Sequence, residues 1–365
     1  MFDPQTWDAV PFSFWAVVFF VLGSMVGSLL NVCIHRMPRG ESIVRPASHC
    51  PHCRYAIPWY LNIPLFTWLY LRGRCANCGA PISVRYFLVE LLTGVAFLCA
   101  WLSYGLVSPA LAAVYCVLLA GLIAATFIDL EHFIIPDEIT LGGMAAGFLV
   151  SALVPLLHRT PSATVALERS GLGMLVGAGI IYAILRLGKL VFGRQRFDLA
   201  PDSKVVFTET SLRLPAQEIP YDELFYRKSD AVMLFAKRVE LIDRCYRNAR
   251  VRLTPSLLLI DGDPFVPEQV THLEVVTDQI TVPREAMGLG DVKFMAAIGA
   301  FLGWPAVIFS LMLSSIIGAT VGVVLIVLRR QEWSSRLPYG PYIALAATVW
   351  IFFGERFLAW WVSRL

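Results

Sequence analysis

Residues 288–328 read GLGDVKFMAAIGAFLGWPAVIFSLMLSSIIGATVGVVLIVL, and this stretch decides the fold of the chain. It holds no charged residue after Lys293, and a helix needs only about 20 apolar residues to cross the hydrocarbon core of a bilayer. The stretch is therefore long enough for two spans, with a tight helical hairpin at the GWP of residues 303–305. Ionisable residues at a membrane boundary are costly, so Asp291 at the mouth of this stretch indicates a functional role.

The composition of the whole chain agrees with a membrane protein. Of its 365 residues, 57% are hydrophobic and 16% are charged, whereas soluble domains carry about 25% charged residues. The mean hydropathy is +0.65. We therefore expect a polytopic α-helical membrane protein. The formal net charge of +3 gives no reason to expect a nucleic-acid partner. The first ten residues lack the positive region of a cleavable signal peptide.

The apolar stretches predict about eight transmembrane helices, the sixth of them short. They fall near residues 14–34, 86–106, 109–128, 139–157, 171–192, 292–304, 305–328 and 340–362. Lys and Arg are concentrated in alternate loops, which sets the orientation under the positive-inside rule. The N-terminus is then outside, and four loops lie in the cytoplasm: 35–85, 129–138, 193–291 and 329–339. With eight spans the C-terminus is outside as well.

Four of the eight cysteines form two CxxC pairs in the first cytoplasmic loop. The sequence CPHC supplies Cys50 and Cys53, and CANC supplies Cys75 and Cys78. Two such turns can complete a tetrahedral shell of four thiolates around a zinc ion, and the spacing between the pairs is close to that of zinc sites. Two disulfides are the alternative, which a reducing cytoplasm disfavours. The spacing leaves open whether the metal is zinc or iron. A closed four-thiolate site is structural and supplies no open position for chemistry.

Two aspartates stand at helix ends on the predicted cytoplasmic side. Asp129 follows the apolar run of the third span, and Asp291 begins the sixth. Two carboxylates at one depth share a proton, so that one activates water while the other donates to a peptide carbonyl. This is the chemistry of an aspartic protease. An aspartate at a helix N-terminus is also often a cap, and the sequence leaves this alternative open for Asp291.

Five residues around the two aspartates are candidates for supporting roles. Two glycines would let an extended substrate backbone approach Asp291, and a lysine would reach the interface or bias the charge of the carboxylate. Pro136 and Asp137 follow Asp129, and Asp137 is also compatible with a cap for the fourth span. Glu90, near the start of the second span, is expected either to pair with Arg85 or to contact a substrate amine or cofactor. The five supporting residues are Gly288, Gly290, Lys293, Pro136 and Asp137.

Several ordered blocks resemble the type IV prepilin peptidases, a family of GxGD membrane aspartic proteases and N-methyltransferases. They are GSLLNVCIHRMP (27–38), the cysteine loop with the span after it (50–94), DLEHFIIPD (129–137), GLGDVKF (288–294) and LPYGPYIAL (337–345). The GxGD motif alone is a weak signal, because presenilin-like proteases share it. Five blocks in order, which cover most of the chain outside residues 193–286, make a strong resemblance.

The resemblance implies both an activity and a place for it. Asp129 and Asp291 would be the catalytic pair, in a bacterial inner membrane with the active site at the cytoplasmic face. The substrate would be a prepilin or pseudopilin of a type IV pilus or type II secretion system, with a short basic leader before a hydrophobic helix. The cysteine loop is associated with members that also methylate the new N-terminus with S-adenosylmethionine. No pattern in the sequence assigns residues to that cofactor.

Residues 193–286 depart from the family pattern, which holds the two aspartate motifs closer together. KVVFTETSLRL and HLEVVTDQITV alternate like strands, whereas SDAVMLFAKRVELIDRCYR has helical spacing. We expect a small β-rich cytoplasmic insert with one helix. Five parts follow: the first helix (1–34), the cytoplasmic zinc-binding loop (35–85), helices two to five (86–192), the α+β insert (193–286) and the GxGD motif with helices six to eight (287–365).

Two other functions remain open from the sequence. One is a GxGD intramembrane protease with another class of substrate, and the other is a non-catalytic membrane scaffold whose zinc module binds a secretion component. A transporter is disfavoured because both aspartates are predicted at one face and not at the bilayer midplane. The sequence does not indicate which precursor is cleaved, what the insert does, or what the oligomeric state is. Membrane lipid is a further partner that the apolar spans imply.

Overall fold

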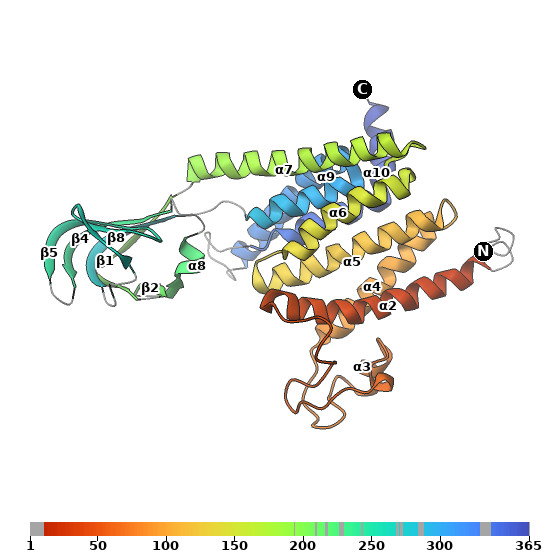
Figure 1. The fold of residues 1–365 in the computed structure, drawn as a ribbon, viewed down its shortest axis with the longest axis horizontal. Helices are drawn as coiled ribbons and strands as arrows, with labels where there is room; N and C mark the ends of the chain where they lie inside the picture. Colours follow the sequence, from red (N-terminus) through yellow and green to blue (C-terminus); the bar gives the residue numbers. More distant parts are fainter. Residues whose placement is uncertain are drawn as a thin grey trace. The chain divides into compact units, whose positions relative to one another are not determined.

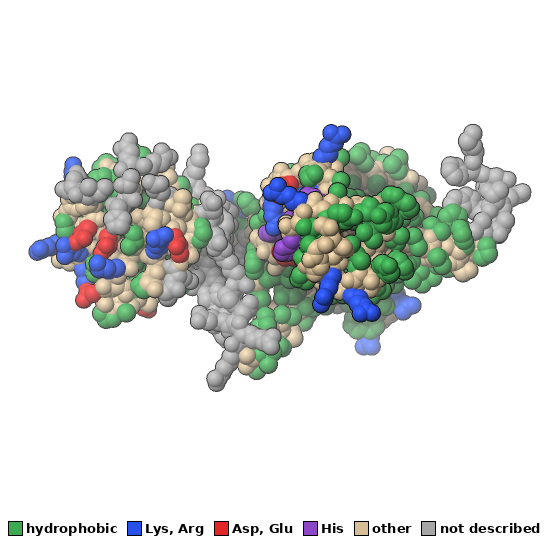
Figure 2. Space-filling view, turned by 90° about the horizontal axis from the view of Figure 1, so that it is seen from below, with side chains coloured by type: hydrophobic (Ala, Val, Ile, Leu, Met, Phe, Trp, Pro, Cys, Tyr) green, Lys and Arg blue, Asp and Glu red, His purple; other side chains and the backbone are tan. Residues whose placement is uncertain are grey.

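The structure is a computed structural model, and it consists of two compact units. It describes residues 11–192, 194–208, 210–215, 218–225, 230–241, 244–267, 270, 273–283, 288–328 and 337–364. One unit is helical and comprises Met1–Tyr182 with Leu289–Leu365, and the other is the insert, Ala183–Gly288 (Figure 1). Figure 2 shows the contrast between their surfaces, because hydrophobic side chains dominate the visible face of the helical unit while charged side chains of both signs dot the insert.

The long helices coincide with the predicted spans. They are α2 (Phe12–Arg36), α4 (Val84–Tyr104), α5 (Pro109–His132), α6 (Asp137–Leu153), α7 (Ala163–Phe192), α9 (Leu289–Val327) and α10 (Gly340–Val362). Six of these described helices are long and apolar enough to cross a membrane. The exception is α6, which has 17 residues. Ser83 and Ser108 begin α4 and α5 as side-chain caps.

The helix α9 contains the hairpin that the sequence predicts at residues 303–305. Gly303 has φ 77° and ψ 173°, which is not helical. A methyl group on Gly299 would lie 3.1 Å from Cγ2 of Val307, although eight residues in a straight helix span about 12 Å. The chain therefore folds back sharply at Gly303, where only glycine adopts the required backbone conformation easily.

A cluster of buried polar side chains forms hydrogen bonds with the backbone beside the break in α9. In a regular helix the carbonyl of Ala300 would accept the N–H of Trp304, which directly follows the non-helical Gly303, and a bare carbonyl is costly in an apolar environment. The hydroxyl of Ser170 on α7 donates to that carbonyl at 2.8 Å. Ser151 on α6 lies against the same carbonyl and makes a 2.9 Å hydrogen bond with Nε2 of His158. These polar residues therefore compensate the break in α9.

Close helix packing depends on glycines spaced four apart, as in GxxxG motifs. A methyl group on Gly173 of α7 would lie 2.1 Å from the carbonyl oxygen of Gly299, and one on Gly177 would lie 2.6 Å from that of Met295. The backbones of α7 and α9 therefore touch directly. Gly23 and Gly27 of α2 approach α4 in the same way.

The insert is one antiparallel sheet with a single buried face. Its described strands are β1 (Arg194–Phe207), β2 (Ser211–Arg213), β3 (Glu218–Pro220), β4 (Val232–Glu240), β5 (Cys245–Leu253), β6 (Leu258–Ile260), β7 (Asp263–Phe265) and β8 (Leu273–Pro283), in the order β3-β2-β1-β8-β4-β5-β6-β7. Val205, Leu212, Val232, Ile260 and Val275 belong to its hydrophobic core. The predicted strands in KVVFTETSLRL and HLEVVTDQITV are confirmed, and the short helix α8 (Tyr221–Leu224) is present.

The helix predicted in SDAVMLFAKRVELIDRCYR is wrong, because this segment forms β4 and the start of β5. Val232, Leu234 and Ala236 alternate toward the core, but the next buried residue is Val239, three positions later. The pairing of β4 with β8 is interrupted at the same place, between Leu234 and Arg238, and resumes in the same register. The buried residues Val232, Ala236 and Val239 are four and three positions apart, which is the spacing of one face of a helix. The sequence pattern therefore predicts a helix where the chain forms an irregular strand.

Substitution of Gly173 by leucine is expected to destabilise the helical unit. The introduced leucine side chain would collide with the backbone of α9, and overpacking of this kind typically costs about 1–3 kcal/mol. Gly179 lies on the same helix with no heavy atom within 4 Å of its Cβ position, so Gly179→Leu is the matched control. Thermal unfolding of the purified protein in detergent should show a lower midpoint for Gly173→Leu alone. Equal midpoints would contradict the direct contact between the two backbones.

Candidate active site and metal centre

Asp129 is held at the C-terminal end of α5. The helix ends where Phe133 adopts a left-handed conformation, with its N–H bonded to the carbonyl of Asp129. Only 5% of the aspartate is exposed. A carboxylate this buried requires a polar partner, and a backbone N–H provides it.

That partner is Gly340, the first residue of α10. Its N–H donates to Oδ2 of Asp129 at 2.8 Å, so the positive end of the α10 dipole faces the carboxylate. A methyl group on Gly340 would lie 2.7 Å from the same oxygen. Glycine is therefore needed for the close approach. Sequence reasoning missed this residue, although it lies in the PYGP block that carries part of the family resemblance.

The GxGD motif lies beside the segment that follows Asp129. Asp291 is in the first turn of α9 and is half-buried. A methyl group on its neighbour Gly290 would be 3.6 Å from Cβ of Ile135, and one on Gly340 would be 3.1 Å from Cδ1 of the same isoleucine. Ile135, itself only 8% exposed, thus contacts both motifs. The structure brings together the three segments that hold Asp129, Asp291 and Gly340.

Two of the predicted supporting residues bind each other. Nζ of Lys293 lies 2.6 Å from Oδ1 of Asp137, an ion pair between α9 and the start of α6. Both side chains are well exposed, so this pair contributes little stability by itself, about 0–1 kcal/mol. Pro136 is the N-cap residue of α6, and Asp137 lies in the first turn of that helix. Asp137 therefore joins two helices and does not occupy the N-cap position.

The expected pairing of Glu90 with Arg85 is wrong. Arg85 pairs with Glu131 of α5, and Oε2 of Glu90 accepts the N–H of Leu65 at 2.7 Å. Leu65 has a positive φ of 64°, which is unusual for a branched side chain. The glutamate therefore holds a strained turn of the cysteine loop against α4.

The cysteine loop folds around its four thiols. Cys50, Cys53, Cys75 and Cys78 place their Sγ atoms within 4.8 Å of one another. The distances Cys50–Cys78 and Cys53–Cys75 are both 3.9 Å, so no disulfide joins them. A tetrahedral ion with metal–sulfur bonds of about 2.3 Å would separate its sulfurs by about 3.8 Å. The site thus fits a zinc-like ion held by all four residues, as a closed structural centre.

The two CxxC pairs adopt one local structure. In each, the first cysteine accepts the N–H of the residue four positions later, Arg54 in one and Gly79 in the other. Both of these residues have a positive φ. The N–H groups of Cys78 and Asn77 lower the pKa of the Cys75 thiol to about 6, which favours the thiolate that a metal needs.

An apolar groove lies between α5, α6 and α9, with a volume of about 230 Å³. Gly121 and Gly142 line it with no heavy atom within 4 Å of their Cβ positions. Phe294, one turn beyond Asp291, also lines it. Gly121 precedes Asp129 on α5 by eight residues, or about 12 Å. One end of the groove therefore lies close to the aspartate motifs.

The fold and site define a class of multi-pass membrane proteins with acidic motifs at helix ends and a four-thiolate loop. Two family models match the chain: the Bacterial Peptidase A24 N-terminal domain over residues 21–104, and the Type IV leader peptidase family over residues 116–195 and 266–323. The chain belongs to the type IV leader peptidase family. The interruption of the second match falls within the insert.

Several curated relatives carry the name "Prepilin leader peptidase/N-methyltransferase". The relative from Aeromonas hydrophila is 27% identical over 380 residues, which cover 97% of this chain and 96% of that protein. The one from Myxococcus xanthus (strain DK1622) is 50% identical over 137 residues, or 38% of this chain and 40% of that protein. The one from Legionella pneumophila is 26% identical over 93% of this chain and 91% of that protein. No solved structure matches the chain.

Substitution of Cys53 by serine is expected to remove the metal. The wild-type protein should contain about one zinc-like ion per chain, because four thiolates complete the shell, and the variant should contain much less after dialysis. Elemental analysis of purified protein measures the content. Cys245→Ser is the matched control, since Cys245 is an exposed thiol outside the cluster. Equal metal in wild type and Cys53→Ser would contradict the site.

Proposed function

We propose that this protein is an aspartic endopeptidase in which Asp129 and Asp291 cleave the leader from a prepilin or pseudopilin. The observation that carries the proposal is the meeting of the two aspartate motifs around Ile135, with Asp129 buried against the N–H of Gly340. Few structural roles require a buried carboxylate at a helix end beside a second acidic motif.

The two carboxylates divide the chemistry of peptide hydrolysis. One removes a proton from water as the water attacks the peptide carbonyl, and the other, protonated, donates to the carbonyl oxygen. The tetrahedral intermediate then collapses as the leaving nitrogen takes a proton. The hydrogen bond from Gly340 fixes one carboxylate oxygen of Asp129, so the other oxygen is the one oriented for proton transfer. The metal centre plays no part in these steps, because its four positions are filled by thiolates.

The substrate class follows from the family and from the position of the site. The relatives named above are prepilin leader peptidases, and the aspartate motifs lie at the ends of apolar helices. A precursor with a basic leader and a hydrophobic helix presents its scissile bond at that depth. We propose eight membrane spans in a bacterial inner membrane, with α9 counted as two, the N-terminus outside and the aspartates at the cytoplasmic face. The cysteine loop and the insert are then cytoplasmic.

The apolar groove supports a place for the hydrophobic helix of the substrate. It opens between membrane helices, its described lining carries no charged residue, and Gly121 and Gly142 leave space in it. A helix that lies in this groove would enter the site at its own N-terminal end, which is where the leader is attached. Binding energy from a remote helix would then help to position the scissile bond.

We also propose that the protein methylates the new N-terminus with S-adenosylmethionine as donor. The names of the relatives support this second activity. The donor supplies an electrophilic methyl group, and the amine freed by cleavage is the nucleophile. Mass measurement of the product N-terminus, with and without the donor, separates the two activities. A product that is trimmed but unmethylated would contradict the methylation proposal and leave the peptidase proposal intact.

Asp129→Asn and Asp291→Asn should each abolish cleavage of a purified prepilin. Loss of one proton-transfer group typically costs about 10²- to 10⁴-fold in rate. The rate of leader removal in detergent, followed by gel shift or mass, is the measurement. Glu355→Gln is the control, because Glu355 is an exposed acid that pairs with Arg159 away from the motifs. Cleavage that persists at wild-type rate in both aspartate variants would leave a non-catalytic scaffold as the better reading.

Gly142→Leu should impair cleavage of full-length prepilin by filling the groove. We expect kcat/KM to fall about tenfold, which corresponds to about 1.4 kcal/mol. A short peptide that spans the cleavage site but lacks the hydrophobic helix should be cleaved equally by variant and wild type. Gly179→Leu on α7 is the matched control, since that glycine also has open space around it. Equal losses on both substrates would contradict the groove as the helix site.

A further inference from the structure

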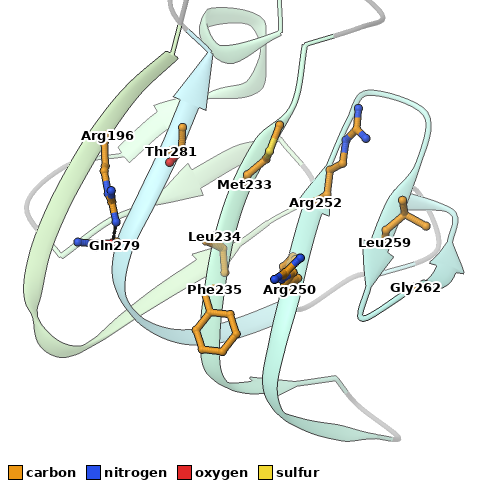
Figure 3. A pocket seen from close by; sticks show the side chains of 11 residues that line it. Arg196, Met233, Leu234, Phe235, Arg250, Arg252, Leu259, Gly262, Gln279 and Thr281 are labelled. Carbon is orange, nitrogen blue, oxygen red and sulfur yellow. Dashed lines mark hydrogen bonds between the residues drawn. The ribbon is translucent and has the colours of Figure 1, made fainter.

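The outer face of the insert sheet carries a trough lined by three arginines. Its volume is about 480 Å³, within the range of ligand sites. Figure 3 shows Arg196 on one side of the trough, and Arg250 and Arg252 on the other, with Met233 and Phe235 between them. The strand registers explain this arrangement, because Arg196 is opposite Thr281, Thr281 opposite Met233, and Met233 opposite Arg252.

The arginines of the trough differ in their partners from four other basic residues of the insert. Lys204, Arg213, Lys237 and Arg238 each pair with a carboxylate. Within the described part of the chain, Arg250 and Arg252 have no carboxylate partner, and Arg196 donates to the neutral side chain of Gln279. None of the described residues that line the trough is acidic.

The positive charge of the trough is local. Residues 183–288 contain 15 basic and 15 acidic residues, so the insert as a whole is electrically balanced. An unpaired cluster of like charges on a balanced domain is unfavourable unless an anion approaches it. The planar guanidinium groups suit phosphate oxygens in particular.

Apolar side chains form the floor between the arginines. Phe235 is 55% exposed, and Met233 and Leu259 also line the trough. A small inorganic anion would gain no favourable contact from these apolar side chains. A phospholipid surface offers both a phosphate for the arginines and acyl-chain or glycerol contacts for the apolar residues.

We propose that this trough binds anionic phospholipid headgroups of the membrane in which the protein is embedded. The insert is joined at both ends to membrane helices, α7 before it and α9 after it. Lipid headgroups are therefore present near the insert at a high effective concentration. An acidic partner from solution would have to compete with them for the trough. The basic leader expected of the substrate is repelled by three arginines, so the trough is distinct from the site of cleavage. This inference does not depend on the proposed peptidase activity.

Hydroxyl-radical footprinting of the full-length protein in lipid nanodiscs tests the proposal. Met233 and Phe235 are readily oxidised, and mass spectrometry measures their rates separately. We compare discs of phosphatidylcholine alone, the same discs with added inorganic phosphate, and discs with phosphatidylglycerol. Tyr246, on β5 but outside the trough, is the internal reference. The two oxidation rates should fall severalfold only with phosphatidylglycerol.

The double variant Arg250→Gln/Arg252→Gln should lose this protection. Each basic residue near an anionic surface is worth about 1 kcal/mol, so removal of two should weaken headgroup binding roughly 30-fold. Lys204→Gln/Arg213→Gln removes the same charge from the same sheet outside the trough, and it should retain the protection. Unchanged oxidation of Tyr246 in phosphatidylcholine discs shows that each variant is folded.

Three outcomes would overturn the proposal. Equal oxidation in phosphatidylcholine and phosphatidylglycerol discs would mean that lipid does not cover the trough, and an acidic protein partner would be its occupant. Protection by inorganic phosphate in neutral discs would mean a soluble anion site. Protection that survives in Arg250→Gln/Arg252→Gln would mean that another surface of the insert meets the membrane.

Discussion

The hydrogen bond between the N–H of Gly340 and the carboxylate of Asp129 is the constraint on which the candidate site depends. It joins the start of α10 to the end of α5, two helices that are distant in sequence. A buried carboxylate without this partner would be costly, and a helix N-terminus without an anion would leave its first N–H groups unsatisfied. The hydrogen bond therefore satisfies both the buried carboxylate of Asp129 and the N–H at the start of α10. Because Gly340 permits no side chain at this contact, the position of Asp129 is fixed by backbone atoms, which move less than side chains do.

The GxGD segment is positioned by a different device, the close contact of backbones. The glycines of α7 bring that helix directly against the first half of α9, and the break at Gly303 turns the second half back toward the start. Without the break a continuous α9 would extend along one direction for 39 residues. In place of an extended helix the chain forms a short, tightly packed segment whose first turn carries Asp291. The hydroxyl groups of Ser170 and Ser151 then lie against the buried carbonyl of Ala300, beside the break. Polar residues in the membrane helices thus serve the fold as well as the chemistry.

Local patterns in the sequence predicted most of the helical unit, because length and apolarity decide a membrane helix with little help from tertiary contacts. The CxxC pairs predicted the metal cluster for the same reason, since each pair closes its own turn. Contacts across the chain were less accessible. The partner of Glu90 is a backbone N–H, which no side-chain pattern reveals. Arg85 has Glu90 near it in the sequence but pairs with Glu131, 46 positions away. In the insert, the irregular burial pattern of β4, where Val239 follows Ala236 as the next buried residue, resembles a helical period. A strand's period is decided by its neighbours in the sheet, and these are not visible locally.

The structure also connects the four-cysteine module, which has no open position for catalysis, to the candidate active site. Glu90 binds the module to α4 through Leu65, and Arg85, earlier on the same helix, binds Glu131, two residues beyond Asp129. The first turns of α4 therefore connect the module to the end of α5. A loop of some 50 residues has too small an apolar core to hold these contacts alone, and a bound ion would provide the stability that the core lacks. Loss of the ion would free Leu65 from its strained conformation and remove one anchor of α4. The module would in this way act on the candidate site through the position of a helix end, while the proposed proton transfers involve only the carboxylates.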